Sequence, residues 1–182
     1  TTHPFGVAIA QAYAALLHVF HGEPDQALAH AEQARAVCAR YGIDYYSSMA
    51  DIIAGWARAV QGPAADGIAQ LRQGIDSFRA TGAEIRLPFY YGLLADACAR
   101  SSNQADALAN VSNGLAFLNQ NAELWAGPWL HLTHGEILLK SGNRTEAMAS
   151  FKRAVDLAQQ LGARSLEARA TAKISKTSYA AT

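Results

Sequence analysis

The stretch HGEILLKSGNRTEAMASFKRAVDLAQQLG, residues 134–162, decides the fold. It holds two helical segments separated by a turn at Gly142, and the second segment ends at Gly162, a residue that favours a left-handed helix stop. Asn143 followed by Glu146 predicts a capped helix start, because a side-chain oxygen can accept the free amides of a first turn. The apolar residues of the second segment recur at helical spacing, at Phe151, Ala154, Val155 and Ala158.

The same pattern occurs four times at a spacing of 40 residues. Small residues recur at Ala15, Gly55, Ala95 and Gly135, and again at Ala27, Gly67, Ala107 and Ala147. The turn positions are Gly22, Gly62, Ser102 and Gly142, and the unit ends are Gly42, Gly82, Ala122 and Gly162. A fixed period of this length is typical of a solenoid, in which each unit buries its apolar face against its neighbours. We therefore predict an all-α solenoid of four helix pairs, with a C-terminal capping helix over 163–180. The pairs are expected at about 4–42, 43–82, 83–122 and 123–162.

Composition sets further bounds on the protein. The chain is 51% hydrophobic and 16% charged, which predicts one globular domain over 1–182. Lys plus Arg equals Asp plus Glu at 15 each, so no net field attracts phosphate backbones, and nucleic acid is not an expected partner. We find no signal peptide and no run near the roughly 20 apolar residues of a spanning helix. We expect a cytoplasmic protein with no membrane partner.

The two ends of the chain differ in character. The last segment places Leu166, Ala170 and Ile174 on one side and charged residues elsewhere, as expected of a capping helix. The first segment is apolar on more than one face, and the sequence begins with Thr1 instead of methionine. We therefore expect a fragment of a longer protein, with weak self-association through the N-terminal end.

The order of residue types in the repeat resembles the tetratricopeptide repeat (TPR) family. The order is clearest at Gly135, Gly142, Ala147, Phe151 and Ala154. The resemblance implies a right-handed α-solenoid of TPR-like helix pairs. The period of 40 exceeds the usual TPR length of about 34 residues, which implies longer helices.

A narrower resemblance concerns the parent protein. It rests on segments at 67–74, 80–84, 88–97, 135–139 and 165–170. These are similar to the C-terminal TPR region of bacterial signalling proteins that join an adenylate or guanylate cyclase, or a transcriptional-regulator head, to a P-loop ATPase module. The resemblance implies that this chain is the non-catalytic end of such a protein, and it carries no phosphate-binding GxxxxGK[ST] loop.

Candidate binding residues come from the first helix of each pair. In TPR solenoids this helix lines the concave face, and the matching positions here are Met49, Trp56, Phe89, Asp96, Arg100, Trp129, Glu136 and Lys140. Aromatic and Arg residues carry much of the energy of protein interfaces, so the set predicts a groove for a protein, a peptide or an adjacent domain of the same polypeptide. The alternatives left open are that Trp56 and Trp129 are packing residues, or that the groove holds a small-molecule effector near Met49, Trp56 and Phe89.

No catalytic or metal site is expected. His131 and His134 lie three residues apart on one helix, as do His18 and His21, but a metal site needs three or four ligands. No nucleophile comes with a base and an orienting group. We therefore predict a regulatory interaction module with no cofactor and no enzymatic activity of its own.

Overall fold

The computed structural model describes residues 3–121 and 123–179, which form nine α-helices and one short 3-10 helix, with no strand among them. The predicted all-α class is confirmed. The predicted unit end Ala122 and the last position of the predicted cap, 180, lie outside the described residues. The chain divides into two compact units, residues 1–84 and residues 85–182.

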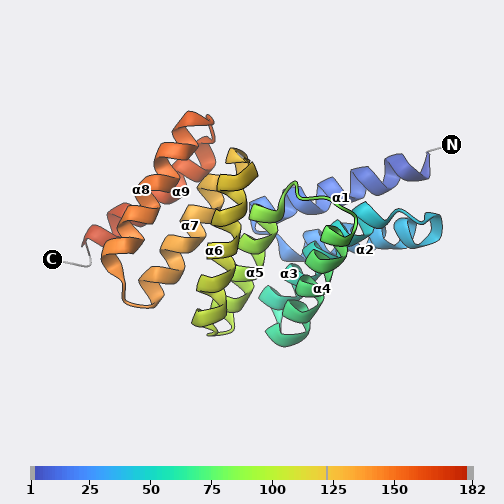
Figure 1. The fold of residues 1–182 in the computed structure, drawn as a ribbon, viewed down its shortest axis with the longest axis horizontal. Helices are drawn as coiled ribbons and strands as arrows, with labels where there is room; N and C mark the ends of the chain where they lie inside the picture. The colour runs from blue at the N-terminus through green and yellow to red at the C-terminus, as the bar shows by residue number, and fades with distance from the viewer. Residues whose placement is uncertain (1–2, 122, 180–182) are drawn as a thin grey trace. The chain divides into compact units, whose positions relative to one another are not determined.

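The first unit consists of two helix pairs. It contains α1 (Pro4–His21), α2 (Pro24–Tyr41), α3 (Asp44–Gln61) and α4 (Ala64–Ala80). Helix α1 packs on α2 and α3 packs on α4, while α3 also contacts both α1 and α2 (Figure 1). Helix α3 is therefore the central element of this unit.

The second unit continues with two pairs and a last helix. It contains α5 (Leu87–Arg100), α6 (Gln104–Asn121), η1 (Leu124–Ala126), α7 (Gly127–Lys140), α8 (Arg144–Gln160) and α9 (Arg164–Tyr179). Helix α5 packs on α6, α7 packs on α8, and α9 packs on α8 and α7. In the predicted pair at 123–162, the part before the Gly142 turn is divided into η1 and α7. Pro128 stands in the first turn of α7, where its missing N–H is not needed.

The interior of the second unit joins α9 to the helix pair before it. A buried cluster contains Leu132, Leu138, Ala147, Phe151, Ala154 and Ala170. Leu166 and Ile174 pack against this cluster, so α9 turns inward the same three residues that the sequence places on one side of the cap.

Helix α1 is unusual in composition. By length and hydropathy it is the one helix in the described part of the chain apolar enough to cross a membrane, a test that core helices and signal sequences also pass. In this structure it buries Ala8, Ala12, Ala15, Leu16 and Val19 within the first unit. No conclusion about the cellular location follows from this single helix.

Small residues bring α3 and α4 into backbone contact. A Cβ on Gly55 would lie 2.6 Å from the backbone nitrogen of Leu71 and 2.8 Å from the carbonyl oxygen of Gly67. At Gly135 in the second unit the nearest atoms are instead those of the Phe151 ring, at 2.4 Å. A side chain can shift more easily than backbone, so the first contact is the stricter constraint.

We predict that Gly55→Ala destabilises the protein by about 3 kcal/mol, because the added methyl separates two helix backbones. Gly6→Ala is the matched control, since a Cβ on Gly6 in α1 meets nothing within 4 Å. The control is expected to be neutral or slightly stabilising, as alanine is the better helix former. Urea denaturation followed by circular dichroism measures both, and equal midpoints for the two variants would contradict the prediction.

One turn adopts a left-handed backbone without glycine. Ser102, at the turn between α5 and α6, has φ 62°, while Gly142 at the equivalent position between α7 and α8 has φ 79°. For residues other than glycine, this conformation is less stable by roughly 1–2 kcal/mol. The third repeat therefore keeps the left-handed turn of Gly22 and Gly142 at an energetic cost, whereas Gly62, between α3 and α4, has φ −155°.

We predict that Ser102→Gly stabilises the second unit by about 0.5–1 kcal/mol, the relief of strain being partly offset by the greater freedom of glycine in the unfolded chain. The reverse change at the equivalent turn, Gly142→Ser, is expected to destabilise by a similar amount. Both are read from denaturation midpoints. Loss of stability in Ser102→Gly would show that the serine side chain supports the turn.

Candidate functional site

The large apolar residues of the sequence-predicted groove are buried. Met49 and Phe89 are 0% exposed, Trp56 is 4% exposed and Trp129 is 8% exposed. Within the second unit, Phe89 and Trp129 lie together, with their ring centroids 5.8 Å apart. Such burial agrees with a packing role for these four side chains, and their role in binding stays a prediction.

Of the charged residues predicted for the groove, Arg100 and Lys140 are exposed, while Asp96 and Glu136 are half-buried. Arg100 Nε donates to both carboxylate oxygens of Asp96 at 3.0 Å, and Lys140 is exposed at the end of α7. Glu136 forms an ion pair with Lys173 of α9 at 2.6 Å.

Helix α9 contacts two of these predicted residues, which sequence reasoning missed. The Arg169 guanidinium lies over the Trp129 ring at 5.2 Å, four residues before the Lys173 that pairs with Glu136. The signal in the sequence is the i, i+4 spacing of two bases on the cap.

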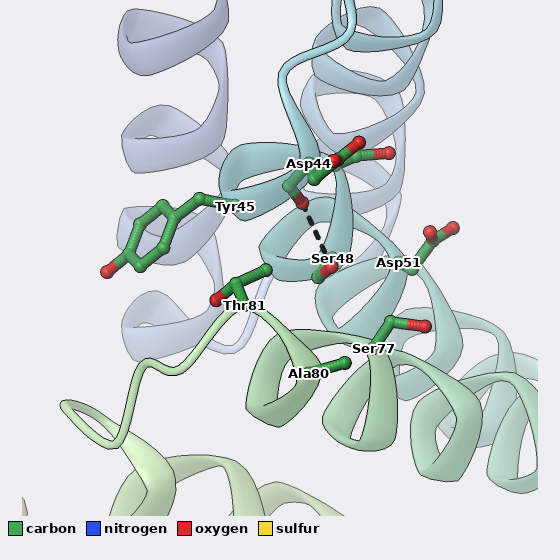
Figure 2. A pocket seen from close by; sticks show the side chains of 8 residues that line it. Asp44, Tyr45, Ser48, Asp51, Ser77, Ala80 and Thr81 are labelled. Carbon is green, nitrogen blue, oxygen red and sulfur yellow. Dashed lines mark hydrogen bonds between the residues drawn. The ribbon is translucent and has the colours of Figure 1, made fainter.

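A concave polar surface lies instead in the first unit, between α2, α3 and α4. Three hollows there share Asp51 in their lining, and we call them together the Asp51 groove. The largest of the three, the α3 hollow, has a volume of about 640 Å³ and is drawn in Figure 2. Its lining residues are Asp44, Tyr45, Ser47, Ser48, Asp51, Ser77, Ala80 and Thr81. The other two hollows measure about 280 and 290 Å³.

The lining of the groove follows helical spacing. On α3, Asp44, Ser47, Ser48 and Asp51 stand at i, i+3, i+4 and i+7, which places them on one face. Figure 2 shows Ser77 of α4 and Thr81, the residue that follows α4, across the hollow from this face. A polar stripe on a helix that is otherwise apolar is the sequence signal for this site. The 40-residue repeat does not reveal this stripe, because the repeat consists of small and apolar positions.

A network of charges holds one side of the groove. Arg35 Nε pairs with Asp51 Oδ1 at 2.7 Å, and Arg35 Nη1 donates to Glu32 at 2.9 and 3.1 Å. Arg58 donates to Glu32 and to Gln70, and Gln70 Nε2 donates to Asp51 Oδ1 at 3.4 Å. Helices α2, α3 and α4 are thus connected through their side chains.

The α3 hollow has a different character from the rest of the groove. No basic residue lines it, whereas Arg35 and Arg58 line the neighbouring hollows. Ser48 Oγ donates to the Asp44 backbone carbonyl at 2.9 Å, as drawn in Figure 2. In the described part of the chain, the side chains of Asp44, Ser47 and Ser77 make no hydrogen bond or ion pair. These groups are open to a ligand.

Asp51 of the groove influences the pKa of the Cys38 thiol. Burial raises the pKa of Cys38, and the negative charge of Asp51 adds to this effect. Cys38 and Cys98 are both buried and form no disulfide, which agrees with a role as small apolar residues in helices. Neither thiol is exposed to act as a nucleophile in this structure.

The two histidines of α7 lie at its contact with α8. Burial, then the positive charge of Arg153 and then His134, lowers the pKa of His131 to about 4. Burial also lowers the pKa of His134, against the opposing effect of Glu146, and His134 Nδ1 lies 3.1 Å from Ser150 Oγ. Among the described residues, no group of three His, Cys, Asp or Glu side chains is placed to hold a metal ion.

Comparison with known proteins gives no assignment: no protein-family model matches this sequence, and no curated protein matches it.

We predict that stability falls as the pH drops from about 6.5 towards about 4, because His131 is protonated first in the unfolded chain. The unfolded state binds the extra proton in this window, so stability rises with pH through it and is complete above 6.5. Across this window, protonation of His131 is expected to lower the free energy of unfolding by on the order of 3 kcal/mol.

His131→Gln is the test variant, because glutamine does not titrate. Urea titrations at pH 7.5 and pH 4.5 are expected to show a smaller loss for this variant than for the wild type. An equal loss would show that His131 does not carry the effect and that other titrating groups do.

Proposed function

We propose that this chain is a non-catalytic protein-interaction and regulatory module that holds an extended segment of a partner polypeptide in the Asp51 groove. The observation that carries the proposal is an open hollow with side-chain acceptors that have no partner in the described part of the protein. An extended backbone cannot satisfy its own N–H and C=O groups, so it needs polar groups from its binding surface. The hydroxyls and amides of α3 and α4 offer such groups.

The dimensions of the groove suit a short segment. From Asp44 to Arg58 the lining follows α3 for 14 residues, or about 21 Å of helix. An extended chain advances about 3.3 Å per residue, so about six residues of a partner fit along it. The exposed, polar walls favour a segment bound at the surface over a small molecule enclosed in a cavity.

The architecture proposed for the module is a right-handed TPR-like α-solenoid. Its support is the 40-residue spacing of small residues, the packing of each helix on its sequence neighbours within each unit, and left-handed turns at equivalent positions. We further propose, from the resemblance, that the module is the C-terminal region of a bacterial, cytoplasmic cyclase- or ATPase-linked signalling protein. Nucleic acid, membrane and cofactors play no part in this proposal.

A second interaction surface is proposed on α1. Phe5, Tyr13 and Leu17 are 47%, 40% and 53% exposed, and α1 carries no Asp, Glu, Lys or Arg. Exposed apolar side chains on an uncharged helix favour association with another surface. Weak self-association through this helix is the form we expect.

A small-molecule effector is the alternative occupant of the α3 hollow. Its volume of about 640 Å³ lies in the usual range of ligand sites, about 300–1,000 Å³. A small effector would raise the melting temperature in a compound screen, because it binds only the folded state.

We predict that the chain retains a defined subset of an immobilised library of random nonapeptides. Gln73→Ala with Ser77→Ala is expected to weaken this binding at least about tenfold, which corresponds to about 1.4 kcal/mol, because both side chains line the groove. Gln26→Ala with Ser165→Ala is the matched control, since both residues are exposed outside it. Binding measured by fluorescence polarisation that is equal in all three proteins would show that the groove is not the site.

A further inference from the structure

We propose that the α3 hollow binds the side chain of an arginine or lysine in the partner segment, with Asp44 as its direct ion-pair partner. This inference rests on the proposed function, because it names the residue that the bound segment carries. It starts from the two carboxylates and four hydroxyl side chains of Ser47, Ser48, Ser77 and Thr81 in the lining. Such a lining is rich in acceptors.

Asp44 is the strongest available partner for a cation. It is exposed in the first turn of α3, and its carboxylate makes no ion pair in the described part of the chain. Ser47 and Ser77, whose side chains also make no hydrogen bond there, stand nearby in the lining. A guanidinium has five N–H donors and an ammonium has three, so either can use a carboxylate and hydroxyls together.

Asp51, at the other end of the hollow, is already paired with Arg35 at 2.7 Å, so its charge is compensated within the protein. It lies seven residues from Asp44, about 10 Å along the helix axis. Arg35 and Gln70 both bind its Oδ1, and its Oδ2 makes no hydrogen bond among the described residues. Asp51 therefore offers a further acceptor, while Asp44 supplies the uncompensated charge.

The protein's own basic residues do not fill this place. Arg35 and Arg58 line only the neighbouring hollows, where both pair with Glu32, and Arg35 also pairs with Asp51. Neither arginine pairs with Asp44. The first unit as a whole has five basic and eight acidic residues, and it contains no lysine. Both the hollow and the unit around it therefore favour a positively charged segment.

An acidic or neutral segment fits this lining less well. A glutamate side chain in the hollow would face the unpaired carboxylate of Asp44, with no base among the lining residues. Like charges placed together in this way cost free energy and select against a partner. The hollow thus discriminates by charge, whereas the hydroxyls and amides of the groove bind any backbone.

The test uses the full chain and nonapeptide sublibraries in which the central residue is fixed as Arg, Lys, Gln or Glu. We expect the wild type to bind the Arg and Lys sublibraries about tenfold more tightly than the Gln sublibrary, as one added ion pair of about 1.4 kcal/mol would give. In Asp44→Asn this preference is expected to disappear. Asp66→Asn is the matched control, because Asp66 is an exposed acid in the first turn of α4 outside the groove, and it should keep the preference.

A second measurement locates the cation. N-acetyl-arginine N-methylamide, titrated into the labelled protein, is expected to shift the backbone amide signals of residues 44–51 and 77–81. N-acetyl-glutamine N-methylamide should leave these signals in place, as should the arginine probe with Asp44→Asn. This experiment does not depend on a partner segment.

The outcomes separate the two proposals. Binding of the sublibraries without a preference for Arg or Lys, or arginine-probe shifts that persist in Asp44→Asn, would overturn this inference and leave the proposed function standing. Retention of no sublibrary by the wild type would overturn the proposed function. Absence of any shift with the arginine probe would overturn the inference by itself.

Discussion

The backbones of α3 and α4 meet at Gly55 and Gly67, and the first unit depends on this contact. A Cβ on Gly67 would lie 2.4 Å from the backbone nitrogen of Ala59 and 2.7 Å from the carbonyl oxygen of Gly55. Neither helix can therefore carry a side chain here without moving apart. The close approach also sets the distance between the polar face of α3 and that of α4, along which the Asp51 groove runs.

The charge network of the groove fixes the positions of its side chains more than it stabilises the fold. The side chains of Arg35, Arg58 and Glu32 are about two-fifths exposed, and exposed ion pairs contribute roughly 0–1 kcal/mol each. Their shared bonds, however, connect three helices and hold both arginines on one side of the groove. Among the described residues, Asp44 of the α3 hollow stays unpaired, because Arg35 is engaged with Asp51 and Glu32 and Arg58 is engaged with Glu32.

The two units differ in their chemistry. The first has more acids than bases, while the second has ten bases against seven acids and contains all of the lysines. In the second unit, bases of α9 contact Trp129 and Glu136, and half-buried histidines lie where α7 meets α8. The open polar surface of the first unit supports the proposed binding role, whereas the histidines of the second unit are expected to make its stability depend on pH.

The sequence by itself determined the helical class, the turns and the inward face of the last helix. These features are local: the spacing of Leu166, Ala170 and Ile174 gives one helix a single apolar side, and a glycine such as Gly142 adopts a left-handed turn at no steric cost. Only the tertiary structure decided the burial of Trp129 and the position of the candidate site. The position of Trp129 in the repeat does not say whether α9 lies over it, and the polar stripe of α3 becomes a groove only when α2 and α4 flank it. Burial and concavity depend on neighbours distant in the chain, which no local spacing encodes.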